Sequence, residues 1–327
     1  MPKTILLSAP YMLPYMDRFM PVFKRFELEV IQPEVRERLS EQEILKYAGQ
    51  FDGAVCGDDR YTERVMQACL PRLKVISKWG TGVDSIDLEA GKRLGIQVRN
   101  TPNAFTLPVS DSIIGYILAF ARQLPRMDRA MKSGEWAKLP GRSLSECSLG
   151  VIGVGNVGKA VLRRARNFGM NLLGNDIVPI APDFVLENGV RMVSLKELLE
   201  RSDFISVNCD LNPTSLHLIN AETLAMIKSG AVLINTARGS IVDEAALVQS
   251  LQSGKLAGAA LDVFEVEPLP LDSPLLKMEN VMLAAHNSNA SPAAWEHVHW
   301  NTLRNLIEGL GLDSKDLDEF RLADKLI

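Results

Sequence analysis

The sequence lacks the features that mark several classes of protein. Only four cysteines occur in 327 residues, with no Cys-x-x-Cys pair and no neighbouring histidines, so neither a disulfide framework nor a metal site is expected. No segment approaches about 18 unbroken apolar residues, the length that a transmembrane helix needs. The N-terminal apolar run at residues 5–7 is too short for the core of a signal peptide. These absences favour a cytoplasmic location with reduced cysteines and no membrane partner.

The sequence also lacks a large excess of positive or negative charge. The 36 lysines and arginines nearly balance 40 acidic residues, giving a net charge of −4. No basic field is available to hold a phosphate backbone, so no nucleic-acid partner is expected. Hydrophobic residues make up 46% and charged residues 23%, as in an ordinary globular protein. The length predicts about two domains of roughly 150 residues each.

Short β-rich apolar runs alternate with stretches of helical periodicity through most of the chain. This alternation predicts an α/β fold with parallel sheets. Strands are expected at 4–7, 28–31, 53–56, 75–77, 98–99, 148–152, 171–176, 191–193, 204–208, 231–235, 257–261 and 281–285. Helices are expected at 41–47, 62–69, 87–94, 108–123, 156–168, 195–201, 221–227, 244–252 and 292–310, and a polar loop at 132–147.

A glycine-rich segment at residues 153–158, with the sequence GVGNVG, is the first motif that carries chemistry. It follows an expected strand and opens an expected helix, as the dinucleotide-binding fingerprint requires. Gly153 would form the tight turn, Gly155 would let a pyrophosphate approach the backbone, and Gly158 would let the helix pack against the strand. The free N–H groups near Asn156 and Val157 would hold the anion. The alternative is a tight turn without a ligand.

An acidic residue follows at the position that selects the cofactor. Asp176 comes 18 residues after Gly158, at the end of the next expected strand. A carboxylate there accepts hydrogen bonds from the adenosine ribose hydroxyls. The next three residues, Ile177-Val178-Pro179, include no cation to hold a 2′-phosphate. The sequence therefore predicts NAD as the cofactor.

Three polar residues follow successive strands of the same expected sheet. Arg238 follows the strand at 231–235, Glu267 the strand at 257–261 and His286 the strand at 281–285. Residues beyond the carboxyl ends of parallel strands face the ligand crevice. Arginine can grip a carboxylate through two hydrogen bonds, and histidine exchanges protons near neutrality. Each residue alone could be structural, but together they predict hydride chemistry on a 2-hydroxy acid.

On these motifs the chain resembles the NAD-dependent D-isomer-specific 2-hydroxyacid dehydrogenases. That family contains phosphoglycerate dehydrogenase, glyoxylate/hydroxypyruvate reductase and D-lactate dehydrogenase. The resemblance extends over nearly the whole chain. It rests on the segment 80–87 (GTGVDSID), the glycine loop with Asp176, the segment 235–239 (NTARG), the segment 261–264 (LDVF) with Glu267, and His286.

The resemblance implies an oxidoreductase that transfers hydride between NAD(H) and the C2 carbon of a D-2-hydroxy or 2-oxo acid. Arg238 would hold the substrate carboxylate, His286 would be the general acid/base, and Glu267 its carboxylate partner. Asp262 would engage the nicotinamide carboxamide. The residues expected at the cofactor, besides the glycine loop and Asp176, are Thr236, Ala237, Arg238, Asp262 and His286.

The family fold explains why the glycine motif begins only at residue 153. It implies two Rossmann-like or flavodoxin-like doubly wound parallel-sheet domains. A cofactor domain of residues 102–289 would be inserted into a substrate domain made of residues 1–101 and 290–327. A homodimer is expected from the resemblance alone.

Substrate contacts are expected in the first domain. Backbone amides of the turn Gly80-Thr81-Gly82 would help to bind the substrate carboxylate. Arg60 or Lys78 could contact a phosphate or a second carboxylate, which would favour phosphoglycerate-like or sugar-acid-like substrates over lactate. Both residues could equally be solvated surface charges. The resemblance also implies glycerate/hydroxypyruvate-like substrates.

The chain departs from the family pattern directly after the histidine. Where the family has two glycines, this sequence has Ser288 and Asn289. Ser288 or Asn289 is therefore expected to reach the substrate or the nicotinamide, and Ser288 is taken as the candidate substrate-binding residue.

Two other hypotheses stay open. The same scaffold could serve an NAD(H)-sensing corepressor or interaction protein, because a fold does not fix a function. Within the enzyme class, an NADP-dependent glyoxylate/hydroxypyruvate reductase is the alternative.

Overall fold

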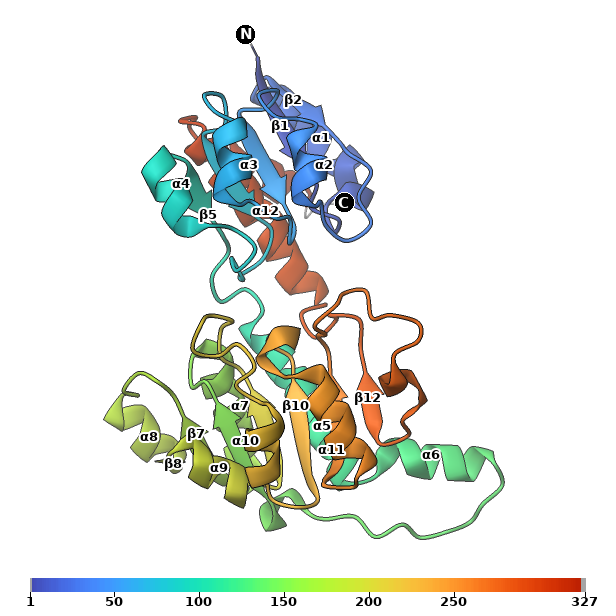
Figure 1. Cartoon of the computed structure of the whole chain (residues 1–327). Coiled ribbons are helices and arrows are strands. Elements are labelled where there is room, and N and C mark those ends of the chain that lie inside the picture. The colour runs from blue at the N-terminus through green and yellow to red at the C-terminus, as the bar shows by residue number, and fades with distance from the viewer. Residues whose placement is uncertain (1, 325–327) are drawn as a thin grey trace. The chain divides into compact units, whose positions relative to one another are not determined.

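The computed structural model describes residues 2–324, which form two compact units (Figure 1). Unit 1 combines the described residues up to Ala104 with those from Ser291 onward, and unit 2 contains Phe105–Ala290. From the sequence, the second domain is expected at residues 102–289. Each unit has its own parallel sheet covered by helices, so the predicted α/β fold class with two doubly wound parallel sheets is confirmed.

Unit 1 contains a five-stranded sheet in the order β2-β1-β3-β4-β5, and every pairing is parallel. Parallel neighbours need a crossover, and a helix supplies each one. The strands are β1 (Lys3–Leu7), β2 (Leu28–Ile31), β3 (Gly53–Cys56), β4 (Val75–Lys78) and β5 (Gln97–Arg99). The helices are η1 (Leu13–Tyr15), α1 (Met16–Arg25), α2 (Glu41–Leu45), α3 (Glu63–Ala68), α4 (Leu88–Leu94), α12 (Pro292–Gly309) and α13 (Asp316–Asp324).

Helix α12 packs on the sheet of unit 1 although it follows all of unit 2 in the sequence. Ser77 Oγ on β4 donates a hydrogen bond of 2.8 Å to the carbonyl oxygen of Thr302. Gly53 on β3 leaves room for Leu306, because a Cβ at Gly53 would lie 2.8 Å from the Leu306 side chain. Unit 1 therefore needs both ends of the chain.

Unit 2 contains a seven-stranded parallel sheet in the order β12-β11-β10-β9-β6-β7-β8. The strands are β6 (Ser148–Ile152), β7 (Asn171–Asn175), β8 (Val190–Met192), β9 (Phe204–Val207), β10 (Ala231–Asn235), β11 (Leu256–Leu261) and β12 (Val281–Leu283). The helices are α5 (Thr106–Ala121), α6 (Leu124–Lys132), η2 (Leu144–Glu146), α7 (Asn156–Asn167), α8 (Pro182–Asn188), α9 (Leu195–Arg201), α10 (Ala221–Met226), η3 (Gly239–Ile241), α11 (Glu244–Gln252) and η4 (Pro274–Lys277).

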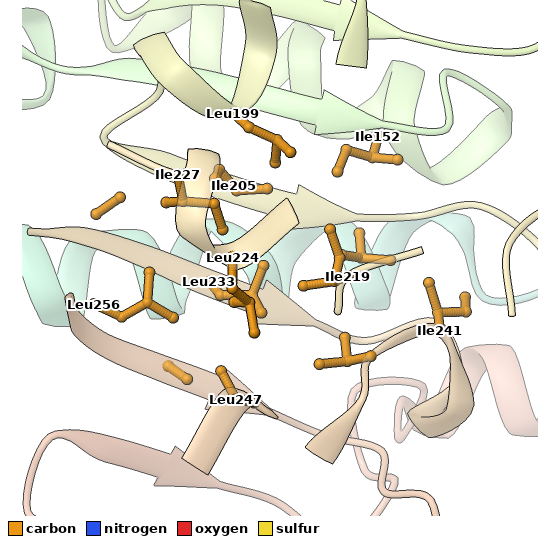
Figure 2. Packing of buried hydrophobic residues seen from close by; sticks show 14 of the residues in the cluster. Ile152, Leu199, Ile205, Ile219, Leu224, Ile227, Leu233, Ile241, Leu247 and Leu256 are labelled. Atoms are coloured by element: carbon orange, nitrogen blue, oxygen red, sulfur yellow. The ribbon is translucent and has the colours of Figure 1, made fainter. Parts of the chain in front are cut away.

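Helices cover both faces of this sheet, and strand side chains alternate between two apolar clusters. On one face, Leu199 of α9, Leu224 of α10 and Leu247 of α11 pack over the strands, together with Leu233 of β10 (Figure 2). On the other face, residues of α5 and α7 pack against neighbouring positions such as Val232. Burial of each such side chain contributes about 1.5–3 kcal/mol. The apolar clusters on the two faces of the sheet hold its parallel strands in place, so their carboxyl ends lie along one edge.

The structure corrects several expected elements. The helix expected at 108–123 runs instead from Thr106 to Ala121, because Gln123 takes a left-handed conformation (φ 52°) and a separate helix, α6, begins after it. The expected strand at 281–285 ends at Leu283, and the expected loop at 132–147 contains the short helix η2. Helices α1, α6, α8 and α13 were not predicted. Proline inside α1 and in the first turns of α6 and α8 obscures their helical pattern.

Features that would suggest a membrane or a metal are not found in residues 2–324. No helix in this part of the chain combines the length and apolarity needed to cross a membrane. The same residues contain no cluster of three or more histidine, cysteine or acidic side chains placed to hold a metal ion. The four cysteines are free thiols, and burial raises the pKa of each one.

The buried carboxylate of Asp203 predicts acid sensitivity of unit 2. Burial alone would raise the pKa of Asp203, but hydrogen bonds from Arg142 (2.8 Å), Lys228 (2.7 Å) and Ser148 lower it well below its ordinary value. A pKa that is lower in the folded than in the unfolded state stabilises the fold above the unfolded pKa of about 3.9. We therefore expect the free energy of unfolding to fall as the pH drops from about 5 towards 2.

The change that tests this expectation is Asp203→Asn. It should lower the free energy of unfolding at pH 7 by about 1–3 kcal/mol and flatten its acid dependence, as measured by urea unfolding at several pH values. Asp128→Asn is the control, because Asp128 forms an exposed ion pair with Lys132 and should change stability little. Equal acid dependence in Asp203→Asn and the unchanged protein would contradict the expectation.

Candidate active site

The carboxyl ends of the strands of unit 2 bring together most residues that the sequence analysis selected. The neighbouring strands β6 and β9 lie where the chain order of the sheet reverses, which is where ligands bind in open α/β sheets. The loop after β6 contacts the loop after β9, since a Cβ on Gly153 would lie 2.5 Å from the backbone nitrogen of Cys209. The candidate site therefore begins at this switch point.

The three glycines of the loop after β6 have distinct local roles. Gly153 has a φ of 87°, which favours glycine, and a Cβ on Gly158 would lie 2.1 Å from the carbonyl oxygen of Gly153. Gly155 is different, because no heavy atom lies within 4 Å of the position where its Cβ would be. Gly155 is also the N-cap of α7 and has no side chain that could cap that helix end. The loop thus leaves open space at the N-terminus of α7, where backbone N–H groups and the helix dipole favour an anion such as a pyrophosphate.

Asp176 lies directly after β7, beside the glycine loop. Its Oδ2 accepts a hydrogen bond of 2.7 Å from the backbone of Val154, and its Oδ1 accepts one of 3.0 Å from Val178. The carboxylate is thereby held at the edge of the loop. Each oxygen can accept a further hydrogen bond, as contact with ribose hydroxyls requires.

His286 and Glu267 form a pair between the loops that follow β12 and β11. His286 Nδ1 lies 3.1 Å from Glu267 Oε2, and Glu267 Oε1 accepts a hydrogen bond of 2.9 Å from the backbone of Phe264. The side chains are 27% and 29% exposed, so both can be reached from solvent. His286 has a φ of 49°, an uncommon conformation for a histidine. A pair of this kind can exchange a proton with a bound ligand.

Asp262 accepts hydrogen bonds from the turn that contains His286. It is only 1% exposed, and its carboxylate accepts hydrogen bonds from the backbone N–H groups of Asn287 (2.7 Å) and Ser288 (2.9 Å). Its carbonyl oxygen accepts a third, of 2.8 Å, from the backbone of His286. Asp262 therefore fixes the turn that carries His286, a role that the sequence analysis did not assign to it.

Arg238 lies in the loop after β10, the strand next to β11 in the sheet. The buried Asn235 shapes this loop, since its side chain donates to the carbonyl oxygen of Arg238 (2.9 Å) and accepts from the backbone of Ala237 (3.1 Å). Gly239 then contacts the following loop, because a Cβ on it would lie 1.9 Å from the backbone of Phe264. The loops that carry Arg238 and Glu267 are thus in direct backbone contact. Thr236 and Ala237 are half-buried on the same loop.

Ser288 is buried beside Tyr116 of α5. It is 5% exposed, and its hydroxyl makes no hydrogen bond of normal geometry within the described residues. Burial raises the pKa of Tyr116, the charge of Asp262 raises it further, and the Ser288 hydroxyl opposes them. Ser288, Tyr116 and Asp262 therefore form a cluster of polar side chains beside the turn that contains His286.

The residues predicted in unit 1 lie at or just after the carboxyl ends of β3 and β4. Lys78 is 4% exposed, and its ammonium lies 3.1 Å from Asp58 and donates to the carbonyl oxygen of Trp79 at 2.8 Å. The charge of Lys78 is therefore compensated, whereas the side chain of Arg60 is exposed.

The turn Gly80-Thr81-Gly82 is held in place by the segment that precedes unit 2. Gly80 has a φ of 113° and its carbonyl oxygen accepts a hydrogen bond from the backbone of Thr101. Thr81 Oγ1 donates to the carbonyl oxygen of Thr101 at 2.9 Å. The turn thus has a fixed shape before any ligand binds.

Sequence reasoning did not assign roles to Asn235, Gly239, Tyr116 or His217. Asn235 and Gly239 flank Arg238 in the sequence, so their positions were a usable signal. No sequence signal pointed to Tyr116 or His217, because their contacts join segments that are far apart in the chain.

Three comparisons relate the chain to known proteins. Residues 114–288 match the family model described as D-isomer specific 2-hydroxyacid dehydrogenase, NAD binding domain. Glyoxylate reductase from Korarchaeum cryptofilum is 40% identical over 243 residues, covering 72% of this chain and 73% of that protein. D-3-phosphoglycerate dehydrogenase from Methanocaldococcus jannaschii is 40% identical over 270 residues, covering 81% of this chain and 51% of that protein.

The chain spans about half the length of the curated phosphoglycerate dehydrogenases that it matches. Among solved structures, D-lactate dehydrogenase from Aquifex aeolicus, complexed with NAD and lactic acid, has a TM-score of 0.81 at 28% identity. That match covers 98% of this chain and 96% of the other.

Proposed function

Because the chain belongs to the D-isomer specific 2-hydroxyacid dehydrogenases, and residues 114–288 are that family's NAD-binding domain, we propose that it reversibly oxidises a D-2-hydroxy acid to the 2-oxo acid. The observation that carries this proposal is the pair of His286 and Glu267, 3.1 Å apart, in unit 2 together with Arg238. The roles of these residues are proposed from their chemistry and their positions.

His286 is proposed as the general acid/base. With Nδ1 turned towards Glu267, Nε2 exchanges a proton with the hydroxyl on C2 of the substrate. Glu267 orients the ring and favours its protonated form by its negative charge. Asp262 keeps the turn in place through its three backbone hydrogen bonds.

Arg238 is proposed to hold the substrate carboxylate. Its planar guanidinium can bind both carboxylate oxygens, and Asn235 fixes the loop that presents it. The backbone amides of Gly80, Thr81 and Gly82 are proposed to bind substrate as well.

When bound, NAD would supply the hydride acceptor. We propose that the glycine loop binds its pyrophosphate through the N–H groups near Asn156 and Val157, and that Asp176 binds the ribose. The space in front of Gly155 supports this assignment. The residues proposed around the rest of the cofactor are Thr236, Ala237, Asp262 and Ser288.

The experiment that tests the function is an absorbance assay of NADH oxidation over a panel of 2-oxo acids. The panel contains glyoxylate, hydroxypyruvate, phosphohydroxypyruvate and sugar-derived 2-oxo acids, each with NADH and with NADPH. We expect turnover of at least one acid and a preference for NADH. Tight NADH binding without turnover of any acid would overturn the proposal in favour of an NAD(H)-sensing interaction protein.

Arg60 is proposed to select for a second anionic group on the substrate. Lys78 is a weaker candidate, because Asp58 compensates its charge. We expect Arg60→Ala to lower kcat/KM for phosphohydroxypyruvate about tenfold relative to hydroxypyruvate, the loss of one charge-assisted hydrogen bond. Arg36→Ala, which removes another exposed arginine of unit 1, is the control. Unchanged selectivity in Arg60→Ala would remove the role.

A homodimer and a cytoplasmic location also stay predictions. Light scattering of the purified protein measures the first directly.

A further inference from the structure

His217 contacts two loops of the candidate site at once. Its backbone N–H donates a hydrogen bond of 2.9 Å to the carbonyl oxygen of Ser240, and its Nε2 lies 2.7 Å from Glu265 Oε1. Ser240 follows Arg238 by two residues, and Glu265 precedes Glu267 by two residues. One histidine thus joins the loop that carries the proposed carboxylate-binding arginine to the loop that carries the partner of His286.

The segment of His217 is firmly attached to the core of unit 2. Ile219, two residues later, is buried and pairs with the segment after Ser240 through hydrogen bonds of 3.1 and 2.8 Å. Figure 2 shows Ile219 and Ile241 within the apolar cluster. The His217 side chain itself is 48% exposed, so it contributes little to that core. Its contacts therefore hold the loops of Ser240 and Glu265 and add little to the packing of the apolar core.

The backbone conformation of His217 also points to a constrained position. Its φ of 48° is uncommon for a residue other than glycine, and such conformations cost about 1–3 kcal/mol unless the surroundings hold them. Here the conformation lets the N–H group face Ser240 while the ring faces Glu265.

The charges around Glu265 explain why a hydrogen-bond donor is needed. The Glu244 carboxylate accepts a hydrogen bond of 3.4 Å from the backbone N–H of Glu265, so a second acidic side chain lies against this segment. Burial raises the pKa of Glu244, and the charge of Glu265 raises it further. The imidazole of His217 offsets this repulsion at Glu265.

We propose that His217 is a positioning residue that fixes the loops of Arg238 and Glu267 relative to each other. Glu265 and Glu267 are two residues apart in this loop, and each contacts a different histidine: Glu265 contacts His217 and Glu267 contacts His286. Glu265 anchors the loop through His217, and Glu267 thereby meets His286. This inference rests on the proposed function.

The test compares His217→Ala with His217→Gln. We expect His217→Ala to lower kcat/KM for the best 2-oxo acid about 10- to 100-fold, because a shift of about 1 Å in catalytic groups costs up to about 100-fold. The Kd for NADH should change less than about twofold. Glutamine places an amide N–H near the position of Nε2, so His217→Gln should recover most of the activity. His297→Ala removes an exposed histidine of α12 in unit 1 and is the control.

Amide hydrogen exchange gives a second readout that does not depend on turnover. We expect faster exchange over residues 262–268 in His217→Ala than in the unchanged protein and in His217→Gln. Glu265→Ala should reproduce both effects, and the double variant should be no worse than either single one, because both remove the same contact.

The outcomes separate the two proposals. Unchanged exchange in His217→Ala, or faster exchange with unchanged kcat/KM, would overturn the positioning role. If the unchanged protein turned over no 2-oxo acid, the proposed function would fail, and the exchange data alone would then decide whether His217 holds the loops.

Discussion

Replacing His286 with asparagine is expected to lower kcat by about 10²- to 10⁴-fold, the contribution of a positioned general acid/base. Asparagine is the informative choice because it tolerates the left-handed conformation that His286 adopts, with a φ of 49°. The turn held by Asp262 should therefore persist. Binding of NADH, measured by fluorescence titration, should change little because the glycine loop is untouched.

A matched variant at the partner residue checks the role of the pair. Glu267→Gln keeps an acceptor for the backbone N–H of Phe264 but removes the negative charge beside His286. We expect a smaller loss of kcat than in His286→Asn and an altered pH profile of kcat/KM. Full turnover by His286→Asn, with normal NADH binding, would show that another group transfers the proton.

The fold of unit 2 could be predicted from the sequence because its signals are local. The strand at 231–235 contains four consecutive apolar residues before Asn235, and the chain before and after it contains clear helical periods. The short helices α6 and α8, each with a proline in its first turn, gave no such signal and were missed. The left-handed conformation of Gln123, which separates α5 from α6, is fixed by its surroundings and has no pattern of its own.

The site could be predicted only in part, for a related reason. Arg238, Glu267 and His286 were found because each follows a strand, and the carboxyl ends of parallel strands meet at one edge. The groups that hold them were not found. The contact between His217 and Glu265 joins residues 48 positions apart, and the one between Asp262 and Ser288 joins residues 26 apart. Only folding brings such residues together.

Lys78 shows how the structure changes a prediction about charge. In the sequence it was a cation available to a phosphate, whereas the structure places it 3.1 Å from Asp58 and largely out of solvent. An anionic substrate group would have to compete with this carboxylate. Arg60 is therefore the better candidate for that contact.

Replacing Gly239 with alanine is the second change with a large expected effect. The new Cβ would lie 1.9 Å from the carbonyl carbon and oxygen of Phe264 and 2.4 Å from the nitrogen of Glu265. These are backbone atoms, so one of the two loops must move. We expect kcat/KM to fall on the order of 100-fold, because Arg238 and Glu267 are then displaced relative to each other. Overpacking should also lower the free energy of unfolding by about 1–3 kcal/mol.

Gly115→Ala distinguishes this effect from a general intolerance of alanine. Gly115 is exposed on helix α5, and no heavy atom lies within 4 Å of the position of its Cβ, so alanine there should be neutral or stabilise by about 0.5–1 kcal/mol. Normal kcat/KM in Gly239→Ala would mean that the loops adapt without consequence for catalysis. A larger loss of kcat/KM in Gly239→Ala than in His217→Ala would instead show that the backbone contact at Gly239 dominates the alignment of the two loops. The contact of His217 would then only refine it. The ratio of the losses in Gly239→Ala and His217→Ala thus measures how the two contacts share the positioning of Arg238 against Glu267.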